Sequence, residues 1–261
     1  MLYNKIKHKL KRNEPCVGLI SNLPSPHLTE IFGISGFEFI VFDLEHSAMS
    51  EETLEGLVRA SKLKNLVPLA RVQKNDPSSI LRVLDAGCLG VMVPNIETRE
   101  EARKAVSSAR YRPDGIRGIN WKVTASEWGA VDPIEYARSA NENILTIIQI
   151  ETVEGVRNLE SILDVEGIDV IIVGPADLSA SMGHPGDPGN PDVQISIEKV
   201  IGICKKSNVA MGIGATTDKE KLTAARENGA LLFYFNPAEF ILEHCFRLVE
   251  DINAGLFSKR G

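Results

Sequence analysis

Eight short apolar runs, spaced along the whole chain and separated by amphipathic stretches, constrain the fold of this sequence most. The runs are rich in Val, Ile and Leu and alternate little with polar residues. Continuous apolar strands of this kind suit a parallel sheet that is buried on both faces. The stretches between them carry helix start signals, such as Ser50 before two glutamates and Asp76 before Pro77. The runs cover residues 16–21, 37–42, 67–72, 90–94, 145–151, 169–174, 209–215 and 231–236.

Repeated strand–helix units fold either into a closed barrel or into an open doubly wound sheet. Eight units in 261 residues favour the barrel, because a (β/α)8 barrel typically needs roughly 250 residues. No G-x-G-x-x-G motif follows a strand, so the dinucleotide-binding alternative lacks its signature. We therefore predict an α/β fold, a (β/α)8 TIM barrel, as a single domain over residues 1–261.

Residues 1–14 are basic and carry Leu2, Ile6 and Leu10 at helical spacing. We expect a helix that closes the bottom of the barrel, because the apolar stripe is too thin for a membrane-surface helix. Two long connections, 111–132 and 176–191, are expected on the active-site face, because each follows a predicted strand.

Charge and cysteine content narrow the function classes. The formal net charge of -6 argues against a nucleic-acid-binding surface. The four cysteines form no C-x-x-C pair, which is typical of reduced thiols. No apolar run is long enough to span a membrane, and no signal core precedes the first strand. A cytoplasmic protein without membrane or nucleic-acid partners is expected.

Two acidic side chains follow consecutive predicted strands. Polar residues at the carboxyl ends of barrel strands are the natural catalytic candidates. Glu151 and Asp177 stand there, and two such carboxylates can share one hard divalent cation such as Mg²⁺ or Mn²⁺. Acids in these positions also cap helix N-termini. The presence of both, together with Arg71 and His46 at other strand ends, favours the metal.

The same strand ends supply candidates for acid–base chemistry and anion binding. Asp43 precedes His46 by three residues, and its carboxylate could fix the tautomer of the imidazole. Arg71 ends an apolar strand and needs an anionic partner, either a substrate carboxylate or a structural ion pair with Asp43 or Glu151. Gln149 projects on the same side of its strand as Glu151 and could support a metal ligand.

These residues carry a resemblance to the HpcH/HpaI family of metal-dependent pyruvate aldolases. The matching motifs occur in the family's order over roughly residues 15 to 250. They are Phe42-Asp43-Leu44-Glu45-His46, Ala70-Arg71-Val72, Leu84-Asp85-Ala86-Gly87, Gln149-Ile150-Glu151-Thr152 and Gly174-Pro175-Ala176-Asp177-Leu178-Ser179.

The resemblance implies a role for each matched position. Glu151 and Asp177 match two metal ligands, Arg71 matches the arginine that holds the keto acid, and His46 matches the catalytic base with Asp43 as its carboxylate partner. Three further positions match residues that line the pyruvate site: Gln149, Gly174 and Ala176. Asp85 matches an acid that approaches the site of a neighbouring subunit. The resemblance also implies one divalent ion (Mg²⁺, Mn²⁺ or Co²⁺), no organic cofactor, and a homo-oligomer, commonly a hexamer, whose last helix is exchanged between subunits.

The chain departs from the family pattern at Arg112, Thr124 and Asn236. These positions lie outside the metal and pyruvate motifs, so they put the aldehyde partner in doubt rather than the core chemistry. The expected reaction is cleavage of a 4-hydroxy-2-oxo acid to pyruvate and an aldehyde.

Three other functions stay open. A Schiff-base aldolase needs a lysine on a strand, and none of the eight runs contains one. A citrate-lyase-like enzyme that acts on a coenzyme A thioester would need basic residues at the rim, for which Arg112, Arg117 and Lys122 are candidates. A keto-acid-binding barrel without turnover is the non-enzymatic alternative.

Overall fold

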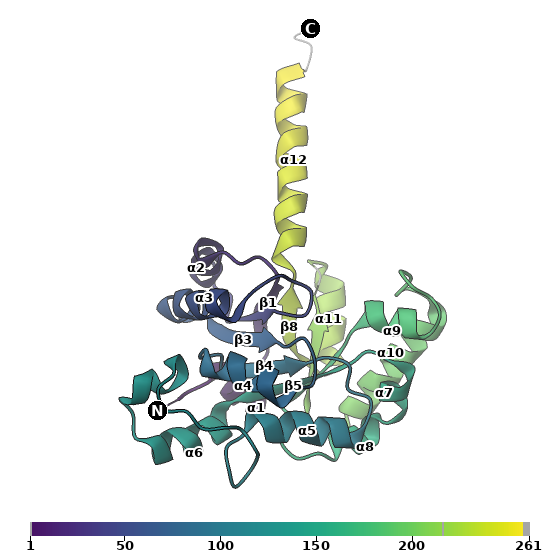
Figure 1. The fold of residues 1–261 in the computed structure, drawn as a ribbon. Helices are drawn as coiled ribbons and strands as arrows, with labels where there is room; N and C mark the ends of the chain where they lie inside the picture. The colour runs from purple at the N-terminus through teal and green to yellow at the C-terminus, as the bar shows by residue number, and fades with distance from the viewer. Residues whose placement is uncertain (1, 216, 258–261) are drawn as a thin grey trace.

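The computed structural model describes residues 2–215 and 217–257, and its strands form a closed parallel barrel in the order of the sequence (Figure 1). All eight predicted strands are present, and their bounds differ from the apolar runs by no more than two residues. The strands are β1 (Cys16–Ser21), β2 (Phe39–Asp43), β3 (Val67–Arg71), β4 (Gly90–Val93), β5 (Leu145–Ile150), β6 (Val170–Val173), β7 (Ala210–Gly214) and β8 (Ala230–Phe235). The fold prediction is confirmed.

Helices surround the barrel, as expected for strands whose side chains are buried on both faces. The helices are α1 (Lys5–Lys11), α2 (Pro26–Ile34), α3 (Glu51–Leu63), α4 (Pro77–Asp85), α5 (Arg99–Ala109), α6 (Pro133–Asn143), α7 (Val153–Arg157), α8 (Leu159–Leu163), α9 (Pro175–Ser181), α10 (Pro191–Cys204), α11 (Lys219–Glu227) and α12 (Pro237–Phe257), with a short 3₁₀ helix η1 (Thr124–Gly129). Ser50 caps α3 and Asp76 caps α4, each by accepting a backbone N–H from the first turn.

Alternation along each strand decides which side chains enter the barrel. One apolar cluster fills the barrel interior, and it includes Phe39 and Val41 of β2 and Val67 and Leu69 of β3. The next residues of the same parity are Asp43 and Arg71, so these two side chains turn inward at the carboxyl ends of their strands. A second cluster lies between the strands and the surrounding helices.

The predicted N-terminal helix closes the barrel from below. Ile6 and Leu10 of α1 are buried and belong to the interior cluster. Asn4 caps the helix and also donates a hydrogen bond to the carbonyl of Leu89, just before β4. The predicted range begins at Met1, which lies outside the described residues.

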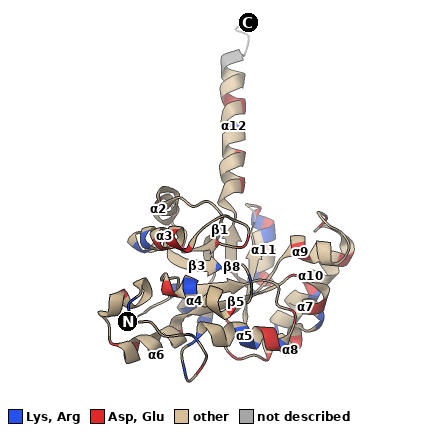
Figure 2. Ribbon diagram, viewed as in Figure 1, with Lys and Arg blue, Asp and Glu red and all other residues tan. Residues whose placement is uncertain are grey.

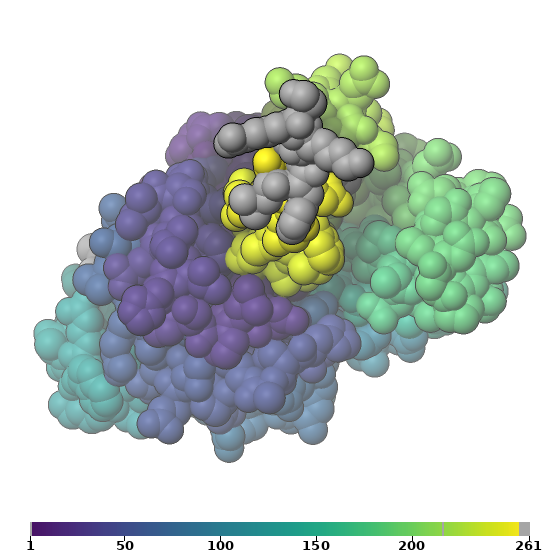
Figure 3. All heavy atoms as spheres, turned by 90° about the horizontal axis from the view of Figure 1, so that it is seen from above, coloured from purple at the N-terminus to yellow at the C-terminus, as the bar shows by residue number. Residues whose placement is uncertain are grey.

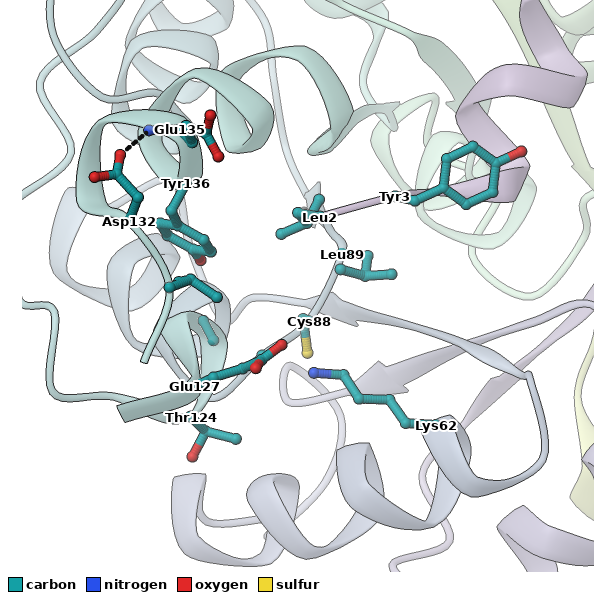
Figure 4. A pocket seen from close by; sticks show the side chains of 13 residues that line it. Leu2, Tyr3, Lys62, Cys88, Leu89, Thr124, Glu127, Asp132, Glu135 and Tyr136 are labelled. Carbon is teal, nitrogen blue, oxygen red and sulfur yellow. Dashed lines mark hydrogen bonds between the residues drawn. The ribbon is translucent and has the colours of Figure 1, made fainter. Parts of the chain in front are cut away.

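The expectation for the connection 111–132 is wrong. This connection follows α5 rather than a strand and leads through η1 and α6 to the start of β5, so it lies at the end of the barrel opposite the strand carboxyl ends. A pocket of about 560 Å³ lies at this opposite end of the barrel. Its lining includes Leu2 before α1, Leu89 before β4 and Thr124 of η1 (Figure 4). The second connection, 176–191, contains most of α9 and follows β6, so it lies at the carboxyl end as expected.

The C-terminal helix α12 stands out from the rest of the molecule (Figures 1 and 3). It has 21 residues, and apolar side chains are exposed on it, among them Leu242, Phe246, Val249 and Ile252. Its charged residues are Glu239, Glu243, Arg247, Glu250 and Asp251, and red acidic bands are visible along the helix in Figure 2. Within the described ranges, no helix combines the length and apolar character needed to cross a bilayer.

Candidate active site

Asp43 and Arg71 form the centre of the candidate site. They are register partners at the ends of the neighbouring strands β2 and β3. The guanidinium of Arg71 donates two hydrogen bonds to the Asp43 carboxylate, from Nε to Oδ1 at 2.9 Å and from Nη2 to Oδ2 at 2.8 Å. Burial raises the pKa of Asp43, but the hydrogen bonds and charge of Arg71 outweigh it, so the pKa lies below its ordinary value. The structure thus shows the ion pair that the sequence left as an alternative for Arg71.

The predicted contact between the Asp43 carboxylate and the His46 imidazole is absent among the described residues. Asp43 Oδ1 instead accepts the backbone N–H groups of Glu45 and His46, at 3.0 and 3.2 Å. These bonds hold the turn after β2, and the His46 side chain is 61% exposed beyond it. Asp43 therefore orients the backbone that carries His46 rather than its ring.

Glu45 is a site residue that the sequence reasoning missed. Its Oε2 lies 3.3 Å from Arg71 Nε and 3.8 Å from His46 Nε2. This oxygen is buried and accepts no hydrogen bond from any described residue. Burial is the main reason that the pKa of Glu45 is raised, although the charge of Arg71 opposes it. Its place between Asp43 and His46 was the only signal in the sequence.

Glu151 lies on the other side of the site, directly after β5. Its side chain is buried and held at both oxygens, since Gln149 Nε2 donates to Oε1 at 2.8 Å and the backbone N–H of Asn95 donates to Oε2 at 3.0 Å. Burial raises the pKa of Glu151 to about 7; the Asn95 bond lowers it, and the charge of Asp177 raises it further. Gln149 thus contacts Glu151, and the role of this pair in holding a metal ion stays a prediction.

The segment after β6 brings a second acid toward Glu151. β5 and β6 are neighbours, as predicted. Asp177 is exposed in the first turn of α9, where the helix dipole also favours an acid. Gly174, the N-cap of α9, has no room for a side chain, because a methyl group there would lie 2.6 Å from Glu151 Oε1. Ala176 is exposed on the same turn.

Asp85 lies away from these residues. It ends α4, at the opposite end of the barrel, and accepts a hydrogen bond from Nη2 of the buried Arg117 at 2.7 Å. Arg117 also stacks on the ring of Tyr111 at 4.5 Å. Asp85 is therefore not part of the candidate active site formed by Asp43, Arg71 and Glu151 in the same chain.

Comparison with known proteins identifies the family of this chain. Residues 17–234 match the family model described as HpcH/HpaI aldolase/citrate lyase. The chain belongs to this family. It is 40% identical over 210 residues to a pyruvate aldolase from Rhizobium etli, which covers 80% of this chain and 82% of that protein. It is also 40% identical to a 5-keto-4-deoxy-D-glucarate aldolase from Salmonella arizonae, over 83% of this chain and 84% of the relative.

Solved structures agree with this assignment. An HpcH/HpaI aldolase/citrate lyase family protein from Burkholderia cenocepacia has a TM-score of 0.90 at 32% identity, covering 96% of this chain and 99% of that one. The citrate synthase SbnG has a TM-score of 0.87 at 29% identity, covering 95% and 97%. Proteins similar to this barrel are thus named both as aldolases and as a citrate synthase.

Proposed function

We propose that this protein is a divalent-metal-dependent aldolase that cleaves a 4-hydroxy-2-oxo acid to pyruvate and an aldehyde. The observation that carries the proposal is the buried Glu151 carboxylate, held beside Asp177 and across the site from the Arg71–Asp43 pair. The relatives named pyruvate aldolase and 5-keto-4-deoxy-D-glucarate aldolase support the same reaction class.

The residues present fit a hard cation such as Mg²⁺, Mn²⁺ or Co²⁺. Glu151 and Asp177 would hold it, and the ion would relieve the repulsion that helps to raise the pKa of Glu151. Gln149 Oε1 is buried with no hydrogen-bond partner in the described part of the chain. No group of three or more His, Cys, Asp or Glu side chains within residues 2–215 and 217–257 forms a complete cage. Two carboxylates plus waters and substrate are the usual ligand set of Mg²⁺.

When bound, the ion would supply Lewis acidity at the keto oxygen of the substrate. The guanidinium of Arg71 has five N–H donors and gives two of them to Asp43, so others remain for the same oxygen. His46, directly or through a water, takes the proton of the C4 hydroxyl. The C3–C4 bond then breaks, its electron pair forms the enolate of pyruvate, and the aldehyde leaves. Gln149, Gly174 and Ala176 are proposed to line the pyruvate site.

We further propose a cytoplasmic homo-oligomer, a hexamer by resemblance, in which α12 is exchanged between subunits. The exposed apolar residues of α12 support an exchange, since such a surface normally has a partner. Asp85 lies at the far end of its own barrel, so any role in catalysis would be in a neighbouring subunit's site. All four cysteines are free, as is usual in a reducing compartment.

The coenzyme A alternative receives less support from this chain. Arg117 is buried in its ion pair with Asp85, and Arg112 and Lys122 belong to the connection at the opposite end of the barrel. None of the three forms a basic rim around the site of its own chain. A keto-acid-binding protein without turnover would differ from the proposed aldolase only in an activity assay.

The test is release of pyruvate from a panel of 4-hydroxy-2-oxo acids before and after exhaustive chelation. Chelation should abolish release, and Mg²⁺, Mn²⁺ or Co²⁺ should restore it. Glu151→Ala and Asp177→Ala should not be rescued at metal concentrations that restore the wild type, whereas the exposed control Glu160→Ala should be. Full activity of the metal-free protein would contradict the proposal.

A further inference from the structure

Tyr234 lies inside the barrel at the level of the candidate site. Its strand, β8, places Leu232 and Tyr234 toward the interior cluster. Its register partner on β1 is Gly18, and its register partner on β7 is Gly214. Register partners in a parallel sheet project to the same face. Both neighbours of Tyr234 therefore lack a side chain at this level.

The phenol ring lies directly beside one of the two glycines, and the other meets Phe39 of β2. A methyl group on Gly214 would lie 3.7 Å from both Cε2 and the hydroxyl oxygen of Tyr234, so the polar end of the ring extends over β7. At Gly18, a methyl group would lie 2.4 Å from the carbonyl oxygen of Phe39, which no side chain could tolerate. Glycine within a strand often marks such a close approach.

The charges around the Tyr234 hydroxyl belong to the site. Burial raises the pKa of Tyr234 to about 12; the positive charge of Arg71 lowers it, and the negative charge of Glu151 raises it. The phenol therefore lies within electrostatic reach of the two groups that flank the keto-acid position, and it keeps its proton at any working pH. It is a neutral donor in a place where the substrate is an anion.

This donor is unpaired within the described part of the chain. No hydrogen bond joins the Tyr234 hydroxyl to another residue in the ranges that the structure describes. The ring is partly buried, and the hydroxyl is not one of the fully buried atoms that lack a hydrogen bond, so a ligand or a water in the site can reach it. A ligand oxygen that accepts its proton would give the hydroxyl a partner that the described residues do not supply.

We propose that Tyr234 is a substrate-binding residue of this site, whose hydroxyl donates a hydrogen bond to an oxygen of the keto acid bound between Arg71 and Glu151. The inference rests on the proposed function and names one more recognition element of that site. It assigns to β8 a contact that strand-end reasoning did not suggest, because Tyr234 precedes the end of its strand.

The experiment is calorimetric titration of pyruvate into wild-type protein and Tyr234→Phe, both with excess Mg²⁺. The variant keeps the ring and removes only the hydroxyl, so pyruvate should bind about tenfold more weakly, the scale of one hydrogen bond. The melting temperature without ligand should not fall, because the hydroxyl makes no bond within the protein. The matched control is Tyr136→Phe, whose hydroxyl is buried at the opposite end of the barrel, and its pyruvate affinity should equal that of the wild type.

Unchanged pyruvate affinity in Tyr234→Phe would overturn the inference and leave the aldolase proposal intact. A lower melting temperature with unchanged pyruvate affinity would also overturn it, because the hydroxyl would then stabilise the folded protein rather than bind substrate. If the wild type neither binds pyruvate nor releases it from any substrate of the panel, the proposed function fails and the inference fails with it.

Discussion

His46 is the catalytic candidate that the structure leaves most open to a substrate. Its ring extends beyond the turn that Asp43 holds, and its Nε2 lies 3.8 Å from Glu45 Oε2. If it takes the C4-hydroxyl proton, His46→Ala should lower aldol cleavage by about 10²–10⁴-fold, the usual scale for loss of a general base. Metal affinity should barely change, because the ring is not a proposed ligand. Initial rates of pyruvate release measure this, and a loss of only a few-fold would remove His46 from the mechanism.

Arg71 pairs with Asp43 and is proposed to bind the keto acid, and substitution by lysine keeps its charge while removing the guanidinium shape. Its planar guanidinium bonds both oxygens of Asp43 and keeps further donors for substrate, whereas a lysine offers one compact ammonium. Arg71→Lys should therefore weaken pyruvate binding and slow turnover, each by roughly tenfold or more. Steady-state kinetics and pyruvate titration test both effects. Wild-type values for both would mean that Arg71 serves only the ion pair with Asp43.

At the scale of elements, the ends of β5 and β6 create a site whose metal affinity should depend on pH near neutrality. The pKa of Glu151 is raised to about 7 in the protein without an ion, mainly by burial, and a metal ligand must be ionised. Below pH 7 a proton therefore competes with the ion, and the Kd for Mg²⁺ or Mn²⁺ should rise by up to about tenfold per pH unit. Above pH 7 the Kd should level off. Titrations between pH 5 and 8 test this, and a Kd that stays constant down to pH 5 would contradict it.

At the scale of the whole molecule, α12 is a helix whose apolar side chains are largely exposed rather than packed against the barrel. Leu242, Phe246 and Val249 share one exposed face at helical spacing. We expect Phe246→Asp to place a charge in a subunit interface and to shift the mass in solution toward the 28.6 kDa monomer. The control His244→Asp lies on the other side of the helix and should keep the wild-type mass. Light scattering measures this, and a wild type that is itself monomeric would contradict the proposed exchange.

The sequence by itself determined the architecture and most of the candidate residues. Apolar runs without polar alternation predicted the buried parallel strands, and Ser50 and Asp76 marked the starts of α3 and α4. These signals are local, because strand periodicity and helix capping depend on residues that are close in the chain. Chain order then placed Glu151 and Asp177 after neighbouring strands, since consecutive strands of a barrel lie side by side.

The tertiary structure alone decided which side chains meet. Asp43 binds the guanidinium of Arg71 and not the ring of His46. The register of β2 and β3 sets Asp43 opposite Arg71, whereas the turn after β2 directs the His46 ring outward. The connection 111–132 lies at the opposite end of the barrel, since it begins after a helix that has already returned there. Tyr234 lies between two strands that carry glycine at its register positions, one 216 residues before it and one 20 residues before it. Such contacts depend on register between strands distant in sequence, and no local pattern encodes them.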